Sequence, residues 1–290
     1  MFERTINKKI EFSGIGVHTG LKTTVALDPA PAGHGIVFVN PKFAQECIKL
    51  GTVIPEIALH ASVLKSKSYI ISTIEHLMAA INAFKIDNIL IEISGIEVPI
   101  LDGSSINFVN LINNAGIKEL EAKKTYLTPV KTLYFKDEKS DREIIIEPAN
   151  FDKETNSFDT NLYFDYFAEF EHALVGKSSI VGEFNIDFFE HEIAPARTFG
   201  FLEQLPYLRS KGLAKGTSLG NTVVIGEDEY LNEPRFENEF VRHKLLDLLG
   251  DIGLLGKNLA GKIVAKKTGH SFNRLVVQDY INNPENWKLI

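Results

Sequence analysis

The feature of this sequence that most restricts its fold is a unit found once in each half: a helix that carries a histidine, a short break, and then a strand. The first unit is the helix Ser72–Phe84 with His76 and the strand Asn88–Ile93; the second is a helix over about Glu237–Leu255 with His243 and the strand Gly261–Ala265. We expect Ser72 or Thr73 to cap the first helix. We interpret the repeat as an internal duplication, which predicts an α+β fold of two related domains. A chance likeness between two helix–turn–strand units is the alternative.

The rest of the chain has mainly the pattern of strands and turns. The further predicted strands are Lys22–Leu27, Gly35–Val39, Val130–Phe135, Glu143–Glu147 and Asn161–Phe167. A turn-rich loop at Val98–Ser105 leads into a helix predicted over Ile106–Ala115, which Gly116 ends. Because the strand pattern restarts after Tyr126, we predict one domain at residues 1–125 and a second at residues 126–290.

Composition narrows the class of protein. Hydrophobic residues make up 44% and charged residues 24%, as in ordinary globular proteins, and no apolar stretch approaches the roughly 18 residues of a membrane helix. Residues Met1–Thr5 lack the pattern of a signal peptide, and the single cysteine, Cys47, excludes an internal disulfide. The net charge of −7 argues weakly against nucleic-acid binding. We expect a cytoplasmic monomer with no transmembrane segment and no nucleic-acid partner.

The second predicted helix carries a pair of potential metal ligands. His243 and Asp247 are four residues apart, so they share one helix face with Cβ atoms roughly 5–6 Å apart. That spacing lets one ion take an imidazole nitrogen and a carboxylate oxygen from a single rigid element. Asp251 lies one further turn along the same face. His-x3-Asp is common, and taken alone it fits a solvated polar face better than a metal site.

The first predicted helix supplies a third candidate ligand. His76 shares its face with a stripe of small residues, Ala79, Ala80 and Ala83, which lets another helix approach closely. His76 can therefore face its counterpart from the other half. Glu75 is adjacent, and a carboxylate beside a metal-bound water is what a general base requires. For this pair alone, a surface glutamate and a packed histidine are the simpler interpretation.

Together, His76, His243 and Asp247 provide two neutral nitrogens and one carboxylate, a ligand set typical of catalytic Zn²⁺ with an open fourth position. Fe²⁺ can compete for such ligands, whereas calcium and magnesium sites do not favour two imidazoles. Glu75, His270 and Asp251 remain as acid–base or supporting groups. A glycine-rich segment at Gly14–Gly20 does not fit a dinucleotide-binding loop, because strand rather than helix follows it, and we predict a tight turn there.

Six segments in order along the chain resemble the UDP-3-O-acyl-N-acetylglucosamine deacetylases, the zinc enzymes of the committed step of lipid A biosynthesis. The segments are Gly14–Gly20, Ser72–Ala80, Val98–Ser105, Ala196–Phe201, Phe240–Asp247 and Gly269–His270. The resemblance implies two α+β domains, each a β-α-α-β sandwich unit, with helical layers packed between two outer sheets. It also implies an insert at about residues 202–231 that frames a passage for the acyl chain.

The resemblance assigns a role to each candidate residue. It implies zinc held by His76, His243 and Asp247, with Glu75 as general base. It implies His270 as the electropositive partner or general acid, oriented by Asp251. Further roles are Thr198 as hydrogen-bond donor to the oxyanion, Lys244 near the polar head of the substrate, and Phe199, Phe201 and His18 in substrate binding. The expected partner is a small UDP-linked acyl-sugar.

Two alternatives stay open from the sequence alone. A zinc amidohydrolase acting on a different N-acylated amine would use the same ligands. A binding module with a structural metal is the other alternative, although structural zinc usually has four ligands, often cysteines, and Cys47 is the only cysteine here.

Overall fold

Two five-stranded mixed sheets form the frame of the computed structural model, which describes residues 1–290. The first sheet has the order β2-β3-β8-β4-β5, with β2 (Ile10–Ile15), β3 (Lys22–Pro29), β8 (Ile89–Ile93), β4 (Ile36–Val39) and β5 (Cys47–Lys49). The second has the order β11-β12-β19-β15-β16, with β11 (Leu133–Asp137), β12 (Arg142–Glu147), β19 (Gly261–Lys266), β15 (Leu162–Glu169) and β16 (Lys177–Glu183). Buried and partly exposed residues alternate along β8 and β15, as expected for sheets covered on one face.

The two sheets have the same topology. In each sheet the last strand in sequence, β8 or β19, occupies the centre. It pairs parallel with the third strand in sequence, β4 or β15, and antiparallel with the second, β3 or β12. Each central strand also follows a helix that carries one of the histidines predicted to bind metal. This correspondence is what the predicted duplication would produce.

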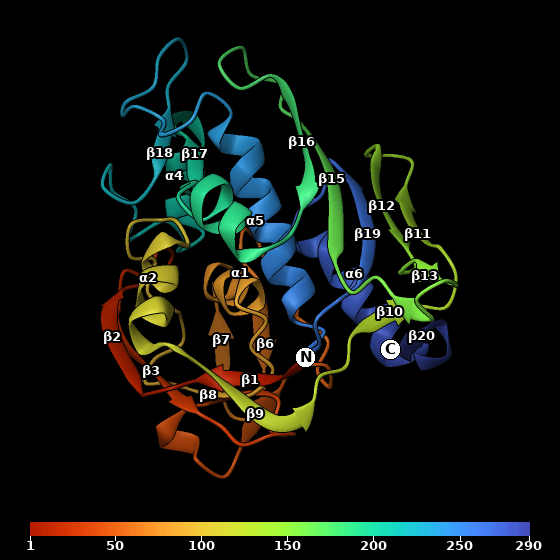
Figure 1. Cartoon of the computed structure of the whole chain (residues 1–290). Helices are drawn as coiled ribbons and strands as arrows, with labels where there is room; N and C mark the ends of the chain where they lie inside the picture. The colour runs from red at the N-terminus through yellow and green to blue at the C-terminus, as the bar shows by residue number, and fades with distance from the viewer.

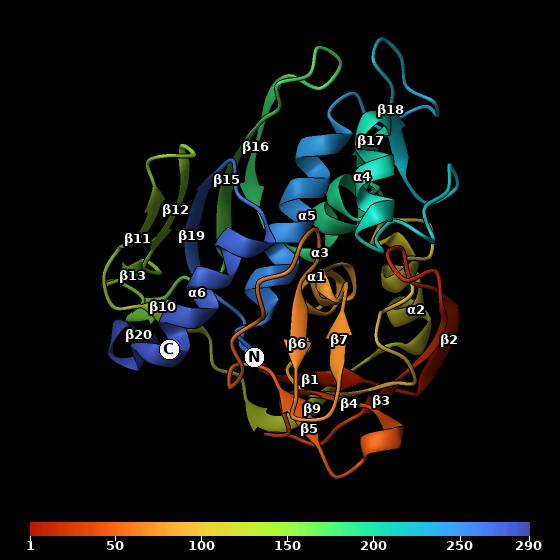
Figure 2. The same cartoon turned by 180° about the vertical axis from the view of Figure 1, so that it is seen from behind.

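The helices pack against one another and against these sheets. They are α1 (Glu75–Ala83), α2 (Ile106–Ala115), α3 (Ile186–Phe188), α4 (Leu205–Ser210), α5 (Glu239–Gly253) and α6 (His270–Asn282). Figures 1 and 2 show α1 and α5 near the centre of the molecule, with β15, β19 and β12 on one side and β3 and β8 on another. None of the helices has the length and apolar character that crossing a bilayer requires.

Short two-stranded sheets complete the fold. These pair β1 (Phe2–Ile6) with β9 (Ile117–Lys123), β6 (Val63–Lys65) with β7 (Ile70–Ser72), β10 (Leu127–Pro129) with β20 (Trp287–Leu289), β13 (Phe151–Asp152) with β14 (Ser157–Phe158), and β17 (Phe199–Phe201) with β18 (Val223–Ile225). The β1–β9 pair joins the start of the first half to its end, and β10–β20 brings the C-terminal end of the chain to the start of the second half (Figure 1). The parallel β17–β18 pair matters most for function, because it forms a wall of the candidate site.

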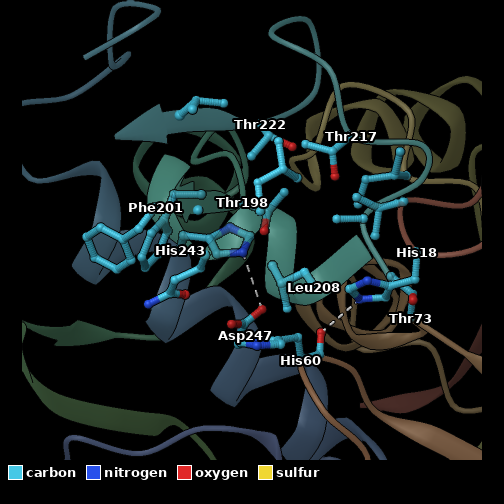
Figure 3. A pocket seen from close by; sticks show the side chains of 18 of the residues that line it. His18, His60, Thr73, Thr198, Phe201, Leu208, Thr217, Thr222, His243 and Asp247 are labelled. Carbon is cyan, nitrogen blue, oxygen red and sulfur yellow. Dashed lines mark hydrogen bonds and ion pairs between the residues drawn. The ribbon is translucent and has the colours of Figure 1, made fainter. Parts of the chain in front are cut away.

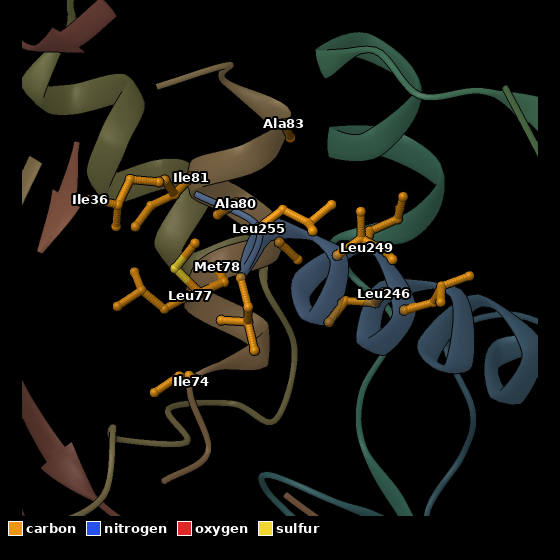
Figure 4. Packing of buried hydrophobic residues seen from close by; sticks show 14 of the residues in the cluster. Ile36, Ile74, Leu77, Met78, Ala80, Ile81, Ala83, Leu246, Leu249 and Leu255 are labelled. Carbon is orange, nitrogen blue, oxygen red and sulfur yellow. The ribbon is translucent and has the colours of Figure 1, made fainter. Parts of the chain in front are cut away.

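One hydrophobic core joins the two halves through the crossing of α1 and α5. Leu77 and Met78 from α1 and Leu246 and Leu249 from α5 are all buried members of this core (Figure 4). The two helix backbones come very close at Gly250, where an added Cβ would lie 2.1 Å from the backbone oxygen of Glu75. A glycine is therefore needed here for contact between the two helix backbones, and this contact fixes the position of Glu75 and its neighbour His76.

We expect Gly250→Ala to lower the free energy of unfolding by about 1–3 kcal/mol, because the new methyl group meets backbone that cannot move aside. Urea unfolding of the purified protein measures the change. Gly253→Ala is the matched control in the same helix, since its Cβ would lie 3.4 Å from the flexible Met78 side chain. The control gains helix propensity and should not destabilise the protein. An equal loss of unfolding free energy in both variants would contradict the conclusion that the helix backbones need a glycine at position 250.

Most predicted elements are present, with small shifts at their ends. The helix predicted over Ile106–Ala115 is confirmed at both ends, and Gly116 follows it at φ 73°. The helix Ser72–Phe84 begins later, at Glu75, and the predicted cap is wrong. Thr73 has φ 57° and its hydroxyl donates to Glu97, and no side chain accepts a bond from the amides at the start of the helix. The tight turn predicted in Gly14–Gly20 lies between β2 and β3, as expected.

Two further differences concern the second half. The strand predicted from Val130 begins only at Leu133, because Val130 is an exposed turn residue that bonds to Asn286. The helix α6 was not predicted at all. The fold is thus mixed α and β as expected, while the division into domains at 125/126 stays a prediction.

Candidate active site

The crossing of α1 and α5 brings three potential metal ligands together at one buried point. His76 is in the first turn of α1, while His243 and Asp247 lie one turn apart on α5. The Nε2 atoms of His76 and His243 lie 3.6 Å and 3.5 Å from Oδ1 of Asp247, and the two imidazole rings are 4.9 Å apart. Because ligand atoms from all three residues lie within 4.8 Å of one another, one ion can contact them all.

The chemistry of this group fits a divalent metal ion. Oδ1 of Asp247 is buried and has no hydrogen-bond partner, which is costly unless a cation binds there. Nδ1 of His243 faces the carbonyl oxygen of Ala196 at 3.1 Å, so its Nε2 is left for the cluster. Burial lowers the pKa of His243 to about 3, so the ring is neutral at pH 7 and has a lone pair to offer.

Lys244 keeps the carboxylate of this group ionised. Its Nζ donates to Oδ2 of Asp247 at 2.6 Å. Burial alone would raise the pKa of Asp247, but the positive charge of Lys244 above all holds that pKa well below its usual range. Burial alone would lower the pKa of Lys244. The negative charge of Asp247 outweighs this effect, and the pKa of Lys244 is raised. Lys244 was expected near the polar head of the substrate; it lines the pocket, but its amino group is bonded to Asp247.

Glu75 is a buried carboxylate beside the ligand group. As the first residue of α1 it precedes His76 directly, and only 2% of its surface is exposed. Its Oε2 accepts a hydrogen bond from the amide of Ser62 at 3.1 Å, and its Oε1 lies 3.8 Å from Nε2 of His270. Burial raises the pKa of Glu75, partly offset by the positive charge of His270. This environment suits a group that takes up a proton.

His270 faces Glu75 from the other half of the molecule. It is the first residue of α6, and its Nδ1 lies 2.9 Å from Oδ2 of Asp251 on α5. The same carboxylate oxygen accepts a bond from the Asn273 side chain at 2.8 Å. Burial alone would lower the pKa of His270, but Asp251, then Glu75 and Asp247, outweigh burial and raise it to about 10. The ring is therefore an imidazolium at neutral pH, with Nε2 directed toward Glu75.

The segment before and within β17 forms a second wall. Two backbone hydrogen bonds hold Thr198. Its amide donates to the carbonyl oxygen of Gly103 at 2.7 Å, and its own carbonyl oxygen accepts from the amide of Val223 at 2.8 Å. Phe199 packs edge-on against Phe240 and lies 6.1 Å, ring to ring, from His243. Thr198 and Phe201 both line the pocket that His243 and Asp247 also line (Figure 3).

A buried ion pair fixes this wall to α5. The side chain of Arg197 is bonded to Glu239, the first residue of α5, with Nε to Oε1 at 3.0 Å. The carboxylate of Glu239 also accepts from the backbone amides of Arg197 and Arg235. Such a fully bonded carboxylate ties the Thr198 segment to the helix that carries His243.

A cavity of about 270 Å³ opens from the ligand group, with residues from both halves in its walls (Figure 3). His18, His60 and Thr73 come from the first half, and Nε2 of His18 lies 3.2 Å from the carbonyl oxygen of His60. The predicted insert at 202–231 supplies much of the opposite wall: Leu202, Gln204, Leu205, Leu208, Ala214, Thr217, Thr222 and Val224. The cavity therefore combines polar and charged side chains with apolar ones, most of which come from the insert.

The structure brings all eleven predicted site residues to one region. Ten of them line the cavity: His18, Glu75, His76, Thr198, Phe199, Phe201, His243, Lys244, Asp247 and His270, while Asp251 lies behind His270. Sequence reasoning missed Ser62, which contacts both Glu75 and Asp251, and Asn273. The spacing of three residues between His270 and Asn273 on one helix is a signal that can reveal Asn273. Nothing in the sequence around Ser62 sets it apart.

A buried His-His-Asp group beside a carboxylate and an imidazolium, at the base of a part-apolar cavity, defines a candidate metallohydrolase centre. The chain belongs to the family described as LpxC, UDP-3-O-acyl N-acetylglycosamine deacetylase, whose model matches residues 3–282. It is 39% identical over 282 residues to the UDP-3-O-acyl-N-acetylglucosamine deacetylase of Nautilia profundicola, covering 97% of this chain and 92% of the relative. The enzyme of that name from Syntrophotalea carbinolica is 39% identical over 294 residues, with 100% and 91% covered. That from Myxococcus xanthus is 37% identical over 292 residues, with 99% and 89% covered.

Proposed function

We propose that this chain is a zinc-dependent deacetylase that hydrolyses the N-acetyl group of UDP-3-O-acyl-N-acetylglucosamine, giving acetate and UDP-3-O-acyl-glucosamine. The activity is that of its family and belongs to lipid A biosynthesis. The observation that carries the proposal is the buried group of His76, His243 and Asp247 in a chain that matches the family over residues 3–282. The relatives match along nearly their whole length, so the likeness extends well beyond the metal site.

His76, His243 and Asp247 would hold the metal, His243 as a neutral ring and Asp247 as an ionised carboxylate. Bound zinc supplies Lewis acidity toward the amide carbonyl. Three protein ligands suit an open catalytic site, whereas structural zinc usually has four. Fe²⁺ is a possible substitute, because it accepts the same nitrogen and oxygen ligands.

The acid–base work falls to Glu75 and His270, whose Oε1 and Nε2 atoms lie 3.8 Å apart beside the ligand group. Glu75 accepts a proton from the attacking water as the new carbon–oxygen bond forms. His270, kept protonated and oriented by Asp251, stabilises negative charge and delivers a proton to the departing glucosamine nitrogen as the carbon–nitrogen bond breaks. The hydroxyl of Thr198 donates to the developing oxyanion, a contribution of about 2.7–4 kcal/mol when well aligned.

The shape of the cavity suits a substrate with a polar sugar and an apolar chain. Phe199, Phe201 and His18 would contact the sugar and nucleotide end, and Lys244 would add positive charge close to the polar head. The acyl chain would follow the apolar wall of the insert, along Leu205, Leu208, Ala214 and Val224. Apolar side chains along such a passage bind an alkyl chain because its burial removes apolar surface from water.

We also infer that residues 1–125 and 126–290 are two related domains. The support is the identical strand order of the two sheets, with a histidine-bearing helix before each central strand. A cytoplasmic location and a monomeric state stay predictions from the sequence.

A substrate without its 3-O-acyl chain is expected to react at least about tenfold more slowly in kcat/KM. The passage would then lose the binding energy that holds the sugar in place at the reacting centre. Acetate release measured from acylated and unacylated UDP-N-acetylglucosamine tests this, with a short acyl chain as an intermediate point. Equal kcat/KM for the acylated and unacylated forms would contradict the substrate assignment and favour a different N-acylated amine.

A further inference from the structure

Ser62 touches both halves of the acid–base pair through two different atoms. It lies directly before β6 and is 4% exposed. Its backbone amide donates to Oε2 of Glu75 at 3.1 Å, and its hydroxyl donates to Oδ1 of Asp251. Its carbonyl oxygen accepts from the amide of Thr73 at 3.0 Å, so the residue is held to the segment that leads into α1.

The hydroxyl of Ser62 completes the set of donors around Asp251. Oδ2 of Asp251 already accepts from Asn273 and lies 2.9 Å from Nδ1 of His270, while Ser62 is the partner of Oδ1. A carboxylate with donors on only one oxygen can turn about its terminal bond, whereas donors on both oxygens fix its plane. The imidazole of His270 is bonded to that plane, so its orientation toward Glu75 follows from it.

Ser62 also links the two halves of the molecule at this point. Glu75 comes from α1 and is set by the Ser62 amide, whereas Asp251 and His270 come from α5 and α6 and are set through the hydroxyl. Nδ1 of His270 lies 3.4 Å from the Ser62 oxygen, so the hydroxyl lies against the ring as well as against its carboxylate. Ser62 therefore contacts groups on both sides of the 3.8 Å separation between Nε2 of His270 and Oε1 of Glu75.

We propose that Ser62 is a positioning residue for the hydrolysis, which aligns His270 with Glu75 by fixing the carboxylate of Asp251. The inference rests on the proposed function, because it gives Glu75 and His270 the acid–base roles. Ser62 itself does not line the cavity and acts only through these neighbours.

Ser62→Ala is the direct test, because it removes the hydroxyl and keeps the amide that bonds to Glu75. With zinc-loaded protein we expect kcat to fall about 10- to 100-fold and KM to stay within about threefold, since the lost bond to a charged group matters in the transition state and not in substrate binding. In a His270→Ala background the same change should add less than about a threefold loss, because the ring through which Ser62 acts is gone.

Ser66→Ala is the matched control. Its hydroxyl also donates to a carboxylate, that of Glu46 at 2.7 Å, but it does not line the cavity and contacts none of the acid–base groups. Its kcat should stay within about twofold of the wild-type value. If Ser62→Ala does not accumulate as folded protein, Ser62→Cys replaces it: the thiol keeps the volume but donates weakly, and we expect a kcat loss of at least about fivefold that also disappears in the His270→Ala background.

Wild-type kcat in the Ser62 variant would overturn the inference. So would a loss that multiplies fully with that of His270→Ala, because that result marks a general structural effect. These outcomes are distinct from failure of the proposed function. That failure is seen in the wild-type protein, which would then release no acetate from the UDP-acyl-sugar with zinc bound.

Discussion

Glu75→Ala is expected to lower kcat/KM by at least about a hundredfold while the protein still binds one zinc ion per chain. Glu75 is buried next to His76, and no other carboxylate outside the ligand group lies as close to Nε2 of His270. If it is the general base, its removal leaves the attacking water without a proton acceptor, and general bases typically contribute 10²–10⁴-fold. The zinc should stay because His76, His243 and Asp247 are unchanged.

Glu75→Gln separates the loss of the base from the loss of packing. The amide side chain has nearly the same size and can still accept the bond from the Ser62 amide, but it cannot take up a proton. We expect the same loss of kcat/KM as in Glu75→Ala, with a midpoint of urea unfolding close to that of the wild type. Glu75→Gln with activity near the wild-type level would remove Glu75 from the role of base, although the metal site could stand.

His243→Ala is expected to lose most of its zinc and more than about a hundredfold in kcat/KM. The number of protein ligands would fall from three to two. The two that remain come from different halves of the chain, His76 from α1 and Asp247 from α5. Metal analysis of the protein after dialysis, together with kcat/KM, measures both effects. The loss of a ligand removes the ion itself. The expected fall in kcat/KM therefore exceeds the 10- to 100-fold loss that is typical when a residue bonded to a metal ligand is replaced.

The matched control for this experiment is His191→Ala. His191 is 69% exposed in its side chain and lies on the short helical turn before Ala194, outside the cavity. It should keep full zinc content and activity, which shows that the loss is not caused by the removal of any histidine. Full zinc occupancy in His243→Ala would exclude His243 from the ligand set.

The periodic elements were predictable because local patterns define them. Ile106–Ala115 has a helical apolar pattern and a glycine after it, and the structure ends the helix there. The helix α6 was missed because Ser, Asn, Phe and Val, which have modest helix propensity, fill its first turns. Its buried residues Phe272, Asn273, Val276 and Val277 still recur at helical spacing, so the signal was present.

The cap of α1 could not be predicted from local sequence. Ser72 and Thr73 match the preference for capping residues, but a residue distant in sequence overrides it. Glu97 accepts bonds from the Thr73 hydroxyl and from the amides of His18 and Thr19, which holds Thr73 at positive φ. A contact between residues far apart in the chain therefore decided this helix end.

The site residues were predictable where they share one helix, and were not predictable where contacts between distant segments bring them together. His243 and Asp247 follow from spacing on one helix, and the small residues around His76 indicate a close helix contact. The position of that contact does not follow from those alanines, because the backbones touch at Gly250 on the other helix. Ser62 was not predictable, because its link to Asp251 joins residues 189 positions apart and serine is common in any loop.

The most direct test of the central claim is acetate release from UDP-3-O-acyl-N-acetylglucosamine by the purified wild-type protein, before chelation, after chelation and after Zn²⁺ is restored. The account predicts one zinc ion per chain, acetate release that a strong chelator abolishes, and recovery of both the metal and the rate when Zn²⁺ is added back. Acetate release that continues at the full rate in protein shown to be free of metal would contradict it.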